Sequence, residues 1–336
     1  MRLLILFFVL LLGGKEYTNP PKPSFDIRGM TMVAPHQPID IEPLHKIKHT
    51  NSNWVALVPY AFQRGEDCVV QYNSNGRWWG ENIEGIRGSV DLAKRAGLKI
   101  MLKPQIYIHG KWTGDIECNT ESFWKSWEES YTKFIMQFAS IAQEKEIEML
   151  CFGTELKNPI KERPAYFVQL IKDIRKIYKG QLTYAANWDD YDMVKFWKDL
   201  DYIGINAYCP LSEKDTPTVA ELANKWKPHL KNMEKFSKKF GKKILFTEYG
   251  YLPINGSTLK PWEVPHQLEK YELNEMVQAN AFESLFSCLS TKSWWAGGFI
   301  WKWFPMSSNG RNGKPHKDFT PQDKLAQKVI ERWYCR

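Results

Sequence analysis

Met149-Leu-Cys-Phe-Gly-Thr-Glu155 and Ile244-Leu-Phe-Thr-Glu248 are the stretches that decide the fold, because each is a short apolar run that ends in a glutamate. An apolar run of this length is typical of a strand buried on both faces, as in a parallel sheet. In a closed parallel barrel, the residue at the carboxyl end of a strand lies at the mouth of the barrel. The two stretches therefore predict two carboxylates at one barrel mouth.

Further apolar runs alternate with longer helical stretches, which is the pattern of repeated strand and helix units. In chain order, the eight predicted strands are Ile27–Met32, Trp54–Pro59, Lys99–Pro104, Met149–Glu155, Leu182–Ala186, Tyr202–Asn206, Ile244–Glu248 and Gly298–Trp301. No second domain or internal repeat is evident in the 336 residues. The sequence thus predicts an α/β fold, a single-domain (β/α)₈ TIM barrel, with the two glutamates ending the fourth and seventh strands.

The helical stretches carry apolar stripes and end signals. The longest stripe, with spacings of three and four residues, is Phe123, Trp127, Tyr131, Phe134, Phe138 and Ile141. We assign these aromatic side chains to the core. Gly97 and Gly241 directly follow predicted helices, where glycine can adopt the left-handed conformation that ends a helix. Pro164 opens the helix that runs to Tyr178.

Side-chain alternation along a strand predicts which residues share a face with the two glutamates. It places Cys151 and Gly153 on the face of Glu155, and Phe246 on the face of Glu248. If these faces point into the barrel, the small residues of the fourth strand leave room for bulky residues across the interior.

Composition narrows the class of partner. The chain has a formal net charge of +8, but its Lys and Arg residues are scattered through predicted helices, which favours a solvated surface over a nucleic-acid interface. Aromatic residues make up 14% of the chain, including 15 tryptophans. They indicate either a large aromatic core or a sugar-binding surface, because the C–H faces of a pyranose pack on flat rings.

The N-terminal segment has the features of an export signal. Met1-Arg2 precedes an apolar run, Leu3–Leu12, that is too short to span a bilayer comfortably. We therefore divide the chain into a secretory signal or short anchor at residues 1–14, a proline-rich tether at 15–25 and the barrel at 26–336. The expected location is extracellular or periplasmic, with no stable membrane span after processing.

The six cysteines, at positions 68, 118, 151, 209, 288 and 335, have no CxxC or other metal-type spacing. Cys151 lies inside a predicted strand and is most simply a small buried hydrophobe. An exported protein can form a disulfide among the loop cysteines, and the spacing leaves the pairing open.

A lone strand-end carboxylate is most simply satisfied by a neighbouring cation or helix N-terminus. Two of them at strand ends four and seven favour catalysis, because retaining glycoside hydrolysis needs an acid/base and a nucleophile. One carboxyl stays protonated and donates to the glycosidic oxygen, while the other stays ionised and attacks the anomeric carbon. This mechanism predicts carboxyl groups about 5–5.5 Å apart. Nothing in the sequence indicates a metal or an organic cofactor.

Five motifs carry a family resemblance: Gly153-Thr-Glu155-Leu, Leu182-Thr-Tyr-Ala-Ala-Asn-Trp188, Asp201-Tyr-Ile-Gly-Ile-Asn-Ala-Tyr208, Phe246-Thr-Glu248-Tyr-Gly250 and Phe319-Thr-Pro-Gln-Asp-Lys-Leu-Ala326. Each is weak alone, but in combination they resemble glycoside hydrolase family 113, part of clan A of retaining barrels. The resemblance extends from the first strand to the last helix. It implies a retaining β-mannanase acting on β-1,4-linked mannan or manno-oligosaccharides, with Glu155 as acid/base and Glu248 as nucleophile.

The resemblance also implies roles for two aromatic residues. Tyr208 lies just past the sixth strand, where a phenol hydrogen-bonded to the nucleophile Glu248 is expected. Such a bond would orient the carboxylate and favour its charged form. Trp301 ends the eighth strand and resembles the clan tryptophan that floors the subsite where the bond is cleaved.

Recognition of the sugar 2-hydroxyl is left open by one difference from the wider clan. Many clan A enzymes carry Asn immediately before the acid/base for this contact, whereas this chain has Thr154, which fits family 113. Asn187 and Asn206 are the candidates for the 2-hydroxyl contact.

Further substrate-binding candidates lie near the ends of the predicted strands or in the loops after them. They are Trp79, Lys103, His109, Trp112, Trp188 and Trp303. An exposed tryptophan at the mouth would stack on sugar, and structural packing is an equal alternative for each. Lys103 and His109 could hydrogen-bond hydroxyls, although a lone histidine is more often structural.

The leading hypothesis is an exported, retaining hydrolase of β-mannan, endo-acting because a cleft bordered by many aromatic residues suits a polymer. Its expected partner is a polysaccharide or oligosaccharide and no nucleic acid. The alternatives are a related retaining barrel acting on β-glucan or xylan, an exo-acting β-mannosidase, and a carbohydrate-binding barrel without catalysis. The presence of both carboxylates argues against the last alternative.

Overall fold

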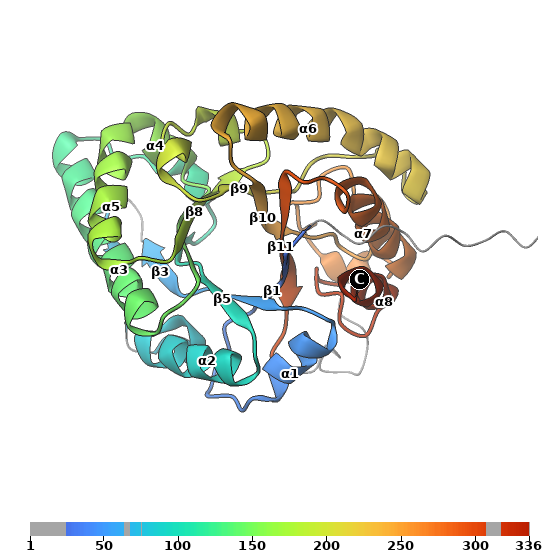
Figure 1. The fold of residues 1–336 in the computed structure, drawn as a ribbon, viewed down its shortest axis with the longest axis horizontal. Coiled ribbons are helices and arrows are strands. Elements are labelled where there is room, and N and C mark those ends of the chain that lie inside the picture. The colour runs from blue at the N-terminus through green and yellow to red at the C-terminus, as the bar shows by residue number, and fades with distance from the viewer. Residues whose placement is uncertain (1–24, 64–67, 75, 307–316, 336) are drawn as a thin grey trace, which may run out of the picture.

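The predicted (β/α)₈ barrel is confirmed by the computed structural model, which describes residues 25–63, 68–74, 76–306 and 317–335 (Figure 1). Parallel strands close into a ring in the order β1-β2-β5-β7-β8-β9-β10-β11. Their bounds are β1 Ile27–Met32, β2 Trp54–Leu57, β5 Lys99–Leu102, β7 Met149–Thr154, β8 Gln181–Asn187, β9 Ile203–Asn206, β10 Ile244–Tyr249 and β11 Trp295–Trp303. All eight predicted strands are therefore present, with ends that differ from the prediction by a few residues.

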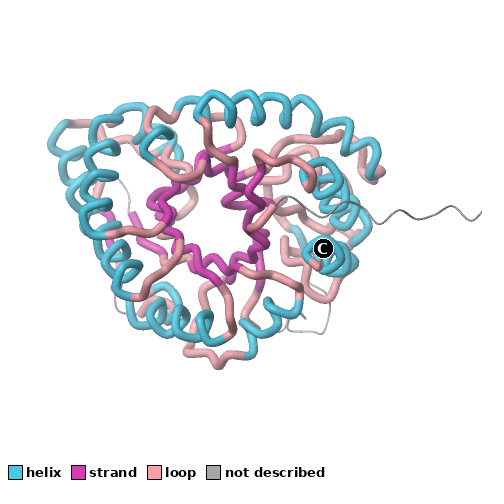
Figure 2. The backbone as a smooth tube through the Cα atoms, viewed as in Figure 1, coloured by secondary structure: helices cyan, strands magenta, loops and turns pink. Residues whose placement is uncertain are grey.

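Helices surround the ring of strands (Figure 2). Their bounds are α1 Glu42–His49, α2 Ile83–Arg95, α3 Glu121–Glu144, α4 Lys157–Glu162, α5 Pro164–Ile177, α6 Val219–Phe240, α7 Glu275–Leu289 and α8 Leu325–Tyr334. Between β8 and β9 the described chain forms two 3₁₀ turns, η3 Tyr191–Met193 and η4 Trp197–Asp199, in place of an α-helix. The predicted end signals hold: Gly241 follows α6 with a φ of 62°, and Pro164 begins α5.

Two prolines interrupt strands that continue beyond the barrel. The prediction ran strands to Pro59 and Pro104, but proline cannot donate a ladder hydrogen bond, and the barrel ladder ends before each of them. Beyond the prolines the chain forms β3 Tyr60–Gln63 and β6 Gln105–Ile108, which pair in parallel, and β4 Val70–Gln71 pairs antiparallel to β3. This three-stranded sheet was not predicted. It brings the first residues of β3 and β6 to the barrel mouth.

The barrel interior is filled by residues of the strands alone. They are Ile27, Trp54, Ala56, Met101, Met149, Cys151, Ala185, Leu245, Ala296 and Phe299. Cys151 thus points inward, but for β10 the inward face is Leu245, and Phe246 packs outward on Trp226 of α6. The alternation argument for β10 is wrong, because the β10–β9 register shifts between Phe246 and Glu248 and turns Glu248 toward the mouth.

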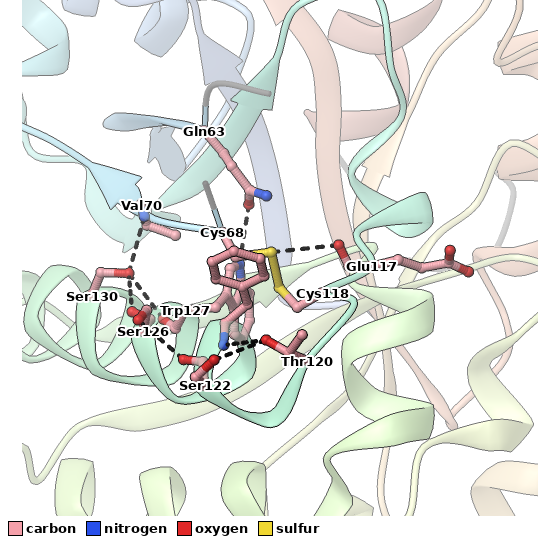
Figure 3. Close-up of a disulfide and its surroundings, with 11 residues drawn as sticks. Gln63, Cys68, Val70, Glu117, Cys118, Thr120, Ser122, Ser126, Trp127 and Ser130 are labelled. Atoms are coloured by element: carbon pink, nitrogen blue, oxygen red, sulfur yellow. Dashed lines mark hydrogen bonds between the residues drawn. A yellow bond between two sulfur atoms is a disulfide. The ribbon is translucent and has the colours of Figure 1, made fainter. Parts of the chain in front are cut away.

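A disulfide fastens the three-stranded sheet to the barrel wall. It joins Cys68, just before β4, to Cys118, just before α3, with Cα atoms 6.0 Å apart (Figure 3). Two hydrogen bonds support it from α3: Trp127 Nε1 donates to Gln63 Oε1 at 3.1 Å, and Ser130 Oγ accepts from the Val70 N–H at 3.0 Å. Cys151, Cys209, Cys288 and Cys335 are free thiols.

The described chain begins inside the fold. Phe25 is 3% exposed and packs on Trp295 with ring centroids 4.7 Å apart. The predicted signal at 1–14 and the tether up to residue 24 lie outside the described residues. Within the described ranges, no helix combines the length and the apolar character that a membrane crossing requires.

Candidate active site

Glu155 and Glu248 are brought together through Asn206. Glu248 of β10 is in ladder register with Asn206 of β9, and Asn206 Nδ2 donates a 2.8 Å hydrogen bond to Glu155 Oε1. Burial raises the pKa of Glu155, and the charge of Glu248 raises it further. The ends of the fourth and seventh barrel strands therefore hold two interacting carboxyl groups. Their separation of about 5–5.5 Å stays a prediction.

A strained turn aims Glu155 into the mouth. Glu155 directly follows β7 with a φ of 53°, a left-handed conformation that residues other than glycine rarely adopt. Its N–H donates to Ala185 O on β8 at 2.8 Å, and the next N–H, of Leu156, donates to Tyr184 Oη at 2.8 Å. Such backbone conformations persist where the surroundings fix them, often at functional sites. Here β8 fixes the turn at two points.

Three donors face the carboxylate of Glu248. Lys103 Nζ forms an ion pair with Oε1, Gln105 Nε2 donates to the same oxygen at 2.8 Å, and Tyr208 Oη donates to Oε2 at 3.1 Å. Lys103 is fully buried, and the Glu248 side chain is 9% exposed. Both oxygens of Glu248 thus accept hydrogen bonds, as an ionised carboxylate does. The predicted Tyr208 contact is present, while Lys103, predicted to bind substrate hydroxyls, lies against Glu248.

Glu155 has a different environment. Asn206 and Trp112 donate to its two oxygens, Trp112 Nε1 at 2.6 Å. Thr247 Oγ1 donates to Asn206 Oδ1 at 2.8 Å, which turns the amide nitrogen of Asn206 toward Glu155. Burial is the largest influence on the pKa of Glu155; these donors oppose it, and the pKa stays above its ordinary value. The protonated form of Glu155 is therefore favoured.

A cavity of about 450 Å³ opens at the ends of the barrel strands β1, β2 and β11. Its lining comes from the ends of β1 and β2, from β3 and β6, from residues 76–81 and from the end of β11; the polar and aromatic members include Tyr60, Arg77, Trp78, Glu81 and Trp301. Burial raises the pKa of Tyr60, and the charges of Glu248 and Glu81 raise it further. Flat rings interspersed with a few hydrogen-bonding groups are typical of a small-ligand site.

Of two tryptophans predicted to bind substrate, one lines this cavity and the other does not. Trp301 lines it and packs against Tyr208 and its apolar neighbours. Trp79 instead lies against α2, where a Cβ on Gly88 would come 2.7 Å from its ring. The adjacent Trp78, 39% exposed, lines the cavity and stacks on His36 with centroids 3.4 Å apart.

Three other predicted residues are outside the cavity lining. Trp303 is 3% exposed and belongs to the core between strands and helices. Asn187 is held in its own loop, because its N–H donates to Asp190 Oδ1 at 2.8 Å and its Nδ2 donates to Asp189 Oδ1 at 3.0 Å. His109 is exposed in the turn after β6. Their predicted roles in substrate binding remain predictions.

Trp188 follows β8 and takes part in a second aromatic group at the mouth. It packs against the cluster that contains Tyr208 and stacks on Trp262, with ring centroids 5.6 Å apart and an interplanar angle of 25°. Trp262 belongs to the long segment after β10 and was not predicted.

Sequence reasoning also missed Tyr60 and Gln105, and from the loop stretch Trp78-Trp79-Gly-Glu81 it chose Trp79 and not Trp78 or Glu81. A signal existed for the first two, because each directly follows a proline that ends a barrel strand and begins an alternating run, Tyr60-Ala-Phe-Gln or Gln105-Ile-Tyr-Ile. Glu81 is half-buried, and burial raises its pKa. Within the described ranges, no group of three or more His, Cys, Asp and Glu side chains is placed to hold a metal ion.

An eight-stranded parallel barrel with two glutamates, each held by hydrogen bonds, at the ends of β7 and β10 defines the class of barrel glycoside hydrolases. The model of Glycoside Hydrolase Family 113 matches residues 36–324. The chain belongs to this family, and its predicted assignment is confirmed.

Solved structures of the family share the fold. The chain is similar to the GH113 β-mannanase AaManA from Alicyclobacillus acidocaldarius, solved in complex with ManMIm, with a TM-score of 0.81 and 23% identity over 93% of this chain and 97% of that chain. A GH113 β-1,4-mannanase solved as a complex gives a TM-score of 0.77 and 25% identity, over 93% of this chain and 99% of that chain. The fold is also similar to that of the β-glucuronidase of Bifidobacterium dentium. The TM-score is 0.59 and the identity is 15%, over 94% of this chain and 47% of that chain. Comparison with curated proteins gives no match.

Proposed function

We propose that the protein is a retaining, endo-acting hydrolase of β-1,4-mannan. The observation that carries the proposal is the unequal environment of the two carboxyl groups. Glu248 receives three donors, one of them the Lys103 ammonium, whereas burial and the neighbouring charge raise the pKa of Glu155. One group is thus prepared to be a carboxylate nucleophile and the other a proton donor.

In the first step, a Glu248 oxygen attacks the anomeric carbon while the bond from that carbon to the glycosidic oxygen breaks. Glu155 gives its proton to the departing oxygen, and the sugar remains as an ester on Glu248. Tyr208, Gln105 and Lys103 hold the carboxylate in place before attack. A fixed nucleophile lowers the entropic part of the barrier.

In the second step, Glu155 must accept a proton from water. Ester formation removes the negative charge of Glu248, and that charge is one cause of the raised pKa of Glu155. The pKa of Glu155 therefore falls when the ester forms, so that Glu155 can act as a base. Water then attacks the anomeric carbon, the ester bond to Glu248 breaks, and the anomeric configuration is retained.

Family membership and two solved relatives named as β-mannanases support mannan as the substrate. For the 2-hydroxyl, which distinguishes mannose from glucose, we favour Asn206 over Asn187. Asn206 lies between the two carboxylates, whereas the amide of Asn187 bonds to its own loop. Endo action is supported by more than one aromatic side chain at the mouth: Trp301 lines the cavity, and Trp188 packs on the cluster that contains Tyr208.

Action outside the cytoplasm is part of the proposal. The Cys68–Cys118 disulfide supports it, because disulfides persist in oxidising compartments and are rare in the cytosol. Detection of the processed protein in culture medium or periplasm, and its absence from the cytosol, is the direct test.

Reducing-sugar release from mannan, glucomannan, xylan and cellulose tests the substrate. We expect release from the first two, and cellulose or xylan turnover without mannan turnover would refute the assignment. NMR of the first product anomer tests retention, since net inversion contradicts the mechanism. Glu248→Ala should be inactive, with partial rescue by azide or formate; near wild-type activity of Glu155→Gln or Glu248→Gln would contradict the residue roles.

A further inference from the structure

Basic side chains gather at the end of the barrel opposite the active-site mouth, which we call the amino-terminal face. Because the strands of the ring pair in parallel, they all begin at this face, and the helices that precede them end there. The last turns of four helices supply basic residues: Lys46 and Lys48 in α1, Lys94 and Arg95 in α2, Arg175 and Lys176 in α5, and Lys238 and Lys239 in α6. Residues that are dispersed through the sequence are thus brought to one face by the fold.

Helix stabilisation explains only part of this arrangement. A cation near the C-terminus of a helix and an anion near its N-terminus both interact favourably with the helix dipole. The first turns of five helices, at the mouth end, accordingly contain a glutamate: Glu42, Glu84, Glu121, Glu221 and Glu275. Lys99, Lys179 and Lys243, however, lie beyond the helices, at the start of β5 and in the segments before β8 and β10. The helix dipole does not account for these three charges.

Several cations of the amino-terminal face have no acidic partner. Acidic residues also occur there, and ion pairs hold Asp26, Asp91, Glu144, Asp173, Asp201 and Glu234. Glu148 accepts a hydrogen bond from the Ile100 N–H at 2.9 Å, and Glu146 and Asp199 are exposed. Within the described ranges, no ion pair engages the exposed side chains of Lys46, Lys94, Arg95, Lys99 and Lys239. The unpaired charge of the face is therefore predominantly positive.

The chain enters the barrel at the same face. The Asp26 N–H donates to Ala296 O of β11 at 3.2 Å, and Asp26 O accepts from Asn53 Nδ2, just before β2, at 2.8 Å. Residues 1–24 come before this point, and their sequence contains the apolar run Leu3–Leu12. An apolar anchor and a polybasic patch together attach a protein to a membrane more stably than either does alone. In this chain the apolar run is joined to the barrel at the polybasic face.

We propose that the amino-terminal face binds the surface of a bilayer that contains anionic lipids. Each basic residue close to such a surface strengthens binding about fivefold, so a face with several unpaired cations suits a layer of lipid phosphates. The proposed substrate, mannan, is uncharged, and substrate binding therefore gives these cations no role. Attached in this way, the barrel holds its mouth, with Glu155 and Glu248, on the side away from the membrane and open to a polymer. The inference goes beyond the proposed function and does not depend on it.

Sedimentation of the full chain with lipid vesicles tests the proposal. We expect binding to vesicles of phosphatidylcholine and phosphatidylglycerol in equal parts, and much weaker binding to vesicles of phosphatidylcholine alone. Salt at about 1 M, where the Debye length is about 3 Å, should release the protein from the mixed vesicles. The triple variant Lys94→Gln, Arg95→Gln, Lys239→Gln removes three exposed charges from the face. It should bind the mixed vesicles about 100-fold more weakly, with unchanged turnover of mannohexaose.

The matched control removes three exposed lysines from helices toward the mouth: Lys125→Gln in α3, Lys161→Gln in α4 and Lys328→Gln in α8. Its net charge equals that of the first triple variant, and it should bind the mixed vesicles as wild type does. Equal losses in the two variants would overturn the proposal, because binding would then follow net charge and not this face.

Other outcomes separate the possible partners. Equal binding of the wild-type chain to the two kinds of vesicle would overturn the proposal, since the apolar run alone would then explain attachment. Binding of linear polyphosphate that needs the amino-terminal face, without binding to either vesicle, would overturn it in favour of a soluble polyanion. Inactivity on mannan together with face-dependent binding to the mixed vesicles would refute the proposed function and support this inference.

Discussion

Lys103 and Glu248 form an ion pair in the interior of the barrel mouth, where Lys103 is fully buried and the Glu248 side chain is 9% exposed. Taking two charges out of water is costly, and their attraction offsets the cost only with good geometry and further hydrogen bonds. Gln105 and Tyr208 supply those hydrogen bonds to Glu248. Lys103 therefore positions the Glu248 carboxylate, the proposed nucleophile, and is also its counter-charge.

Lys103→Met should damage both stability and turnover. It leaves the Glu248 charge buried without a cation, which typically costs about 3–5 kcal/mol in the free energy of unfolding. Loss of the held geometry should lower kcat by about 100-fold. Urea denaturation and steady-state kinetics on mannohexaose measure the two effects.

Lys145→Met is the matched control, because Lys145 pairs with Asp91 on the surface at 2.9 Å. Surface pairs contribute about 0–1 kcal/mol, so this variant should unfold near the wild-type midpoint with unchanged kcat. Equal effects of the two substitutions would contradict the role of Lys103.

Trp112→Phe should move the basic limb of the pH–rate profile upward. The Trp112 N–H stabilises the ionised form of Glu155 and so lowers its pKa, against the raising effect of burial. Without that donor the pKa of Glu155 rises, and the protonated acid persists to higher pH. The basic limb of kcat/KM reports this value in the free enzyme. Trp79→Phe, in a tryptophan that lies against α2, is the control; an unmoved or lowered basic limb for Trp112→Phe would refute the argument.

Removal of the Cys68–Cys118 disulfide should destabilise the three-stranded sheet that carries Tyr60 and Gln105. The bridge spans 50 residues, for which the chain-entropy relation gives about 4 kcal/mol of stabilisation. We expect Cys118→Ser to lower the free energy of unfolding by roughly 2–4 kcal/mol. Cys288→Ser, at a free thiol, serves as the control. A wild-type protein whose unfolding midpoint is the same with and without reductant would contradict the prediction.

The barrel and its two glutamates could be predicted because their signals are local. Each strand is a separate apolar run, and a strand-end position follows from counting. The faces of β10 could not be predicted, since the register shift between Phe246 and Glu248 depends on pairing with β9. Alternation therefore placed Phe246 on the face of Glu248, whereas Phe246 packs on Trp226 of α6.

Site residues supplied by loops were the least predictable. Trp78 and Trp79 are adjacent in sequence, but Trp78 lines the cavity, whereas Trp79 lies against α2, where Gly88 has no side chain to displace it. Trp262 stacks on Trp188 although the two residues are far apart in the sequence, and no sequence pattern predicts this contact. Lys103 was identified as a site residue, but its contact with Glu248 depends on barrel closure.

Asp190 is a buried carboxyl group in the turn that follows β8. It is 2% exposed, and its Oδ2 has no hydrogen-bond partner among the described residues. Burial raises its pKa from 3.8 to about 7; the charges of Asp189 and Glu155 add to the effect, while the Asn187 N–H and Lys157 oppose it. The folded state thus holds the Asp190 proton more tightly than the unfolded chain does.

The consequence is a loss of stability as pH rises from about 4 to about 7, because in this window the folded protein binds a proton that the unfolded chain has released. The upper limit is about 4 kcal/mol, from about 1.4 kcal/mol per pKa unit. Asp190→Asn keeps an oxygen acceptor for the Asn187 N–H and cannot ionise. Its unfolding free energy should match wild type near pH 4 and exceed it at pH 8. Thermal and urea unfolding at the two pH values measure this difference, with the exposed Asp192→Asn as control; parallel pH dependences of wild type and Asp190→Asn would exclude Asp190 as the cause.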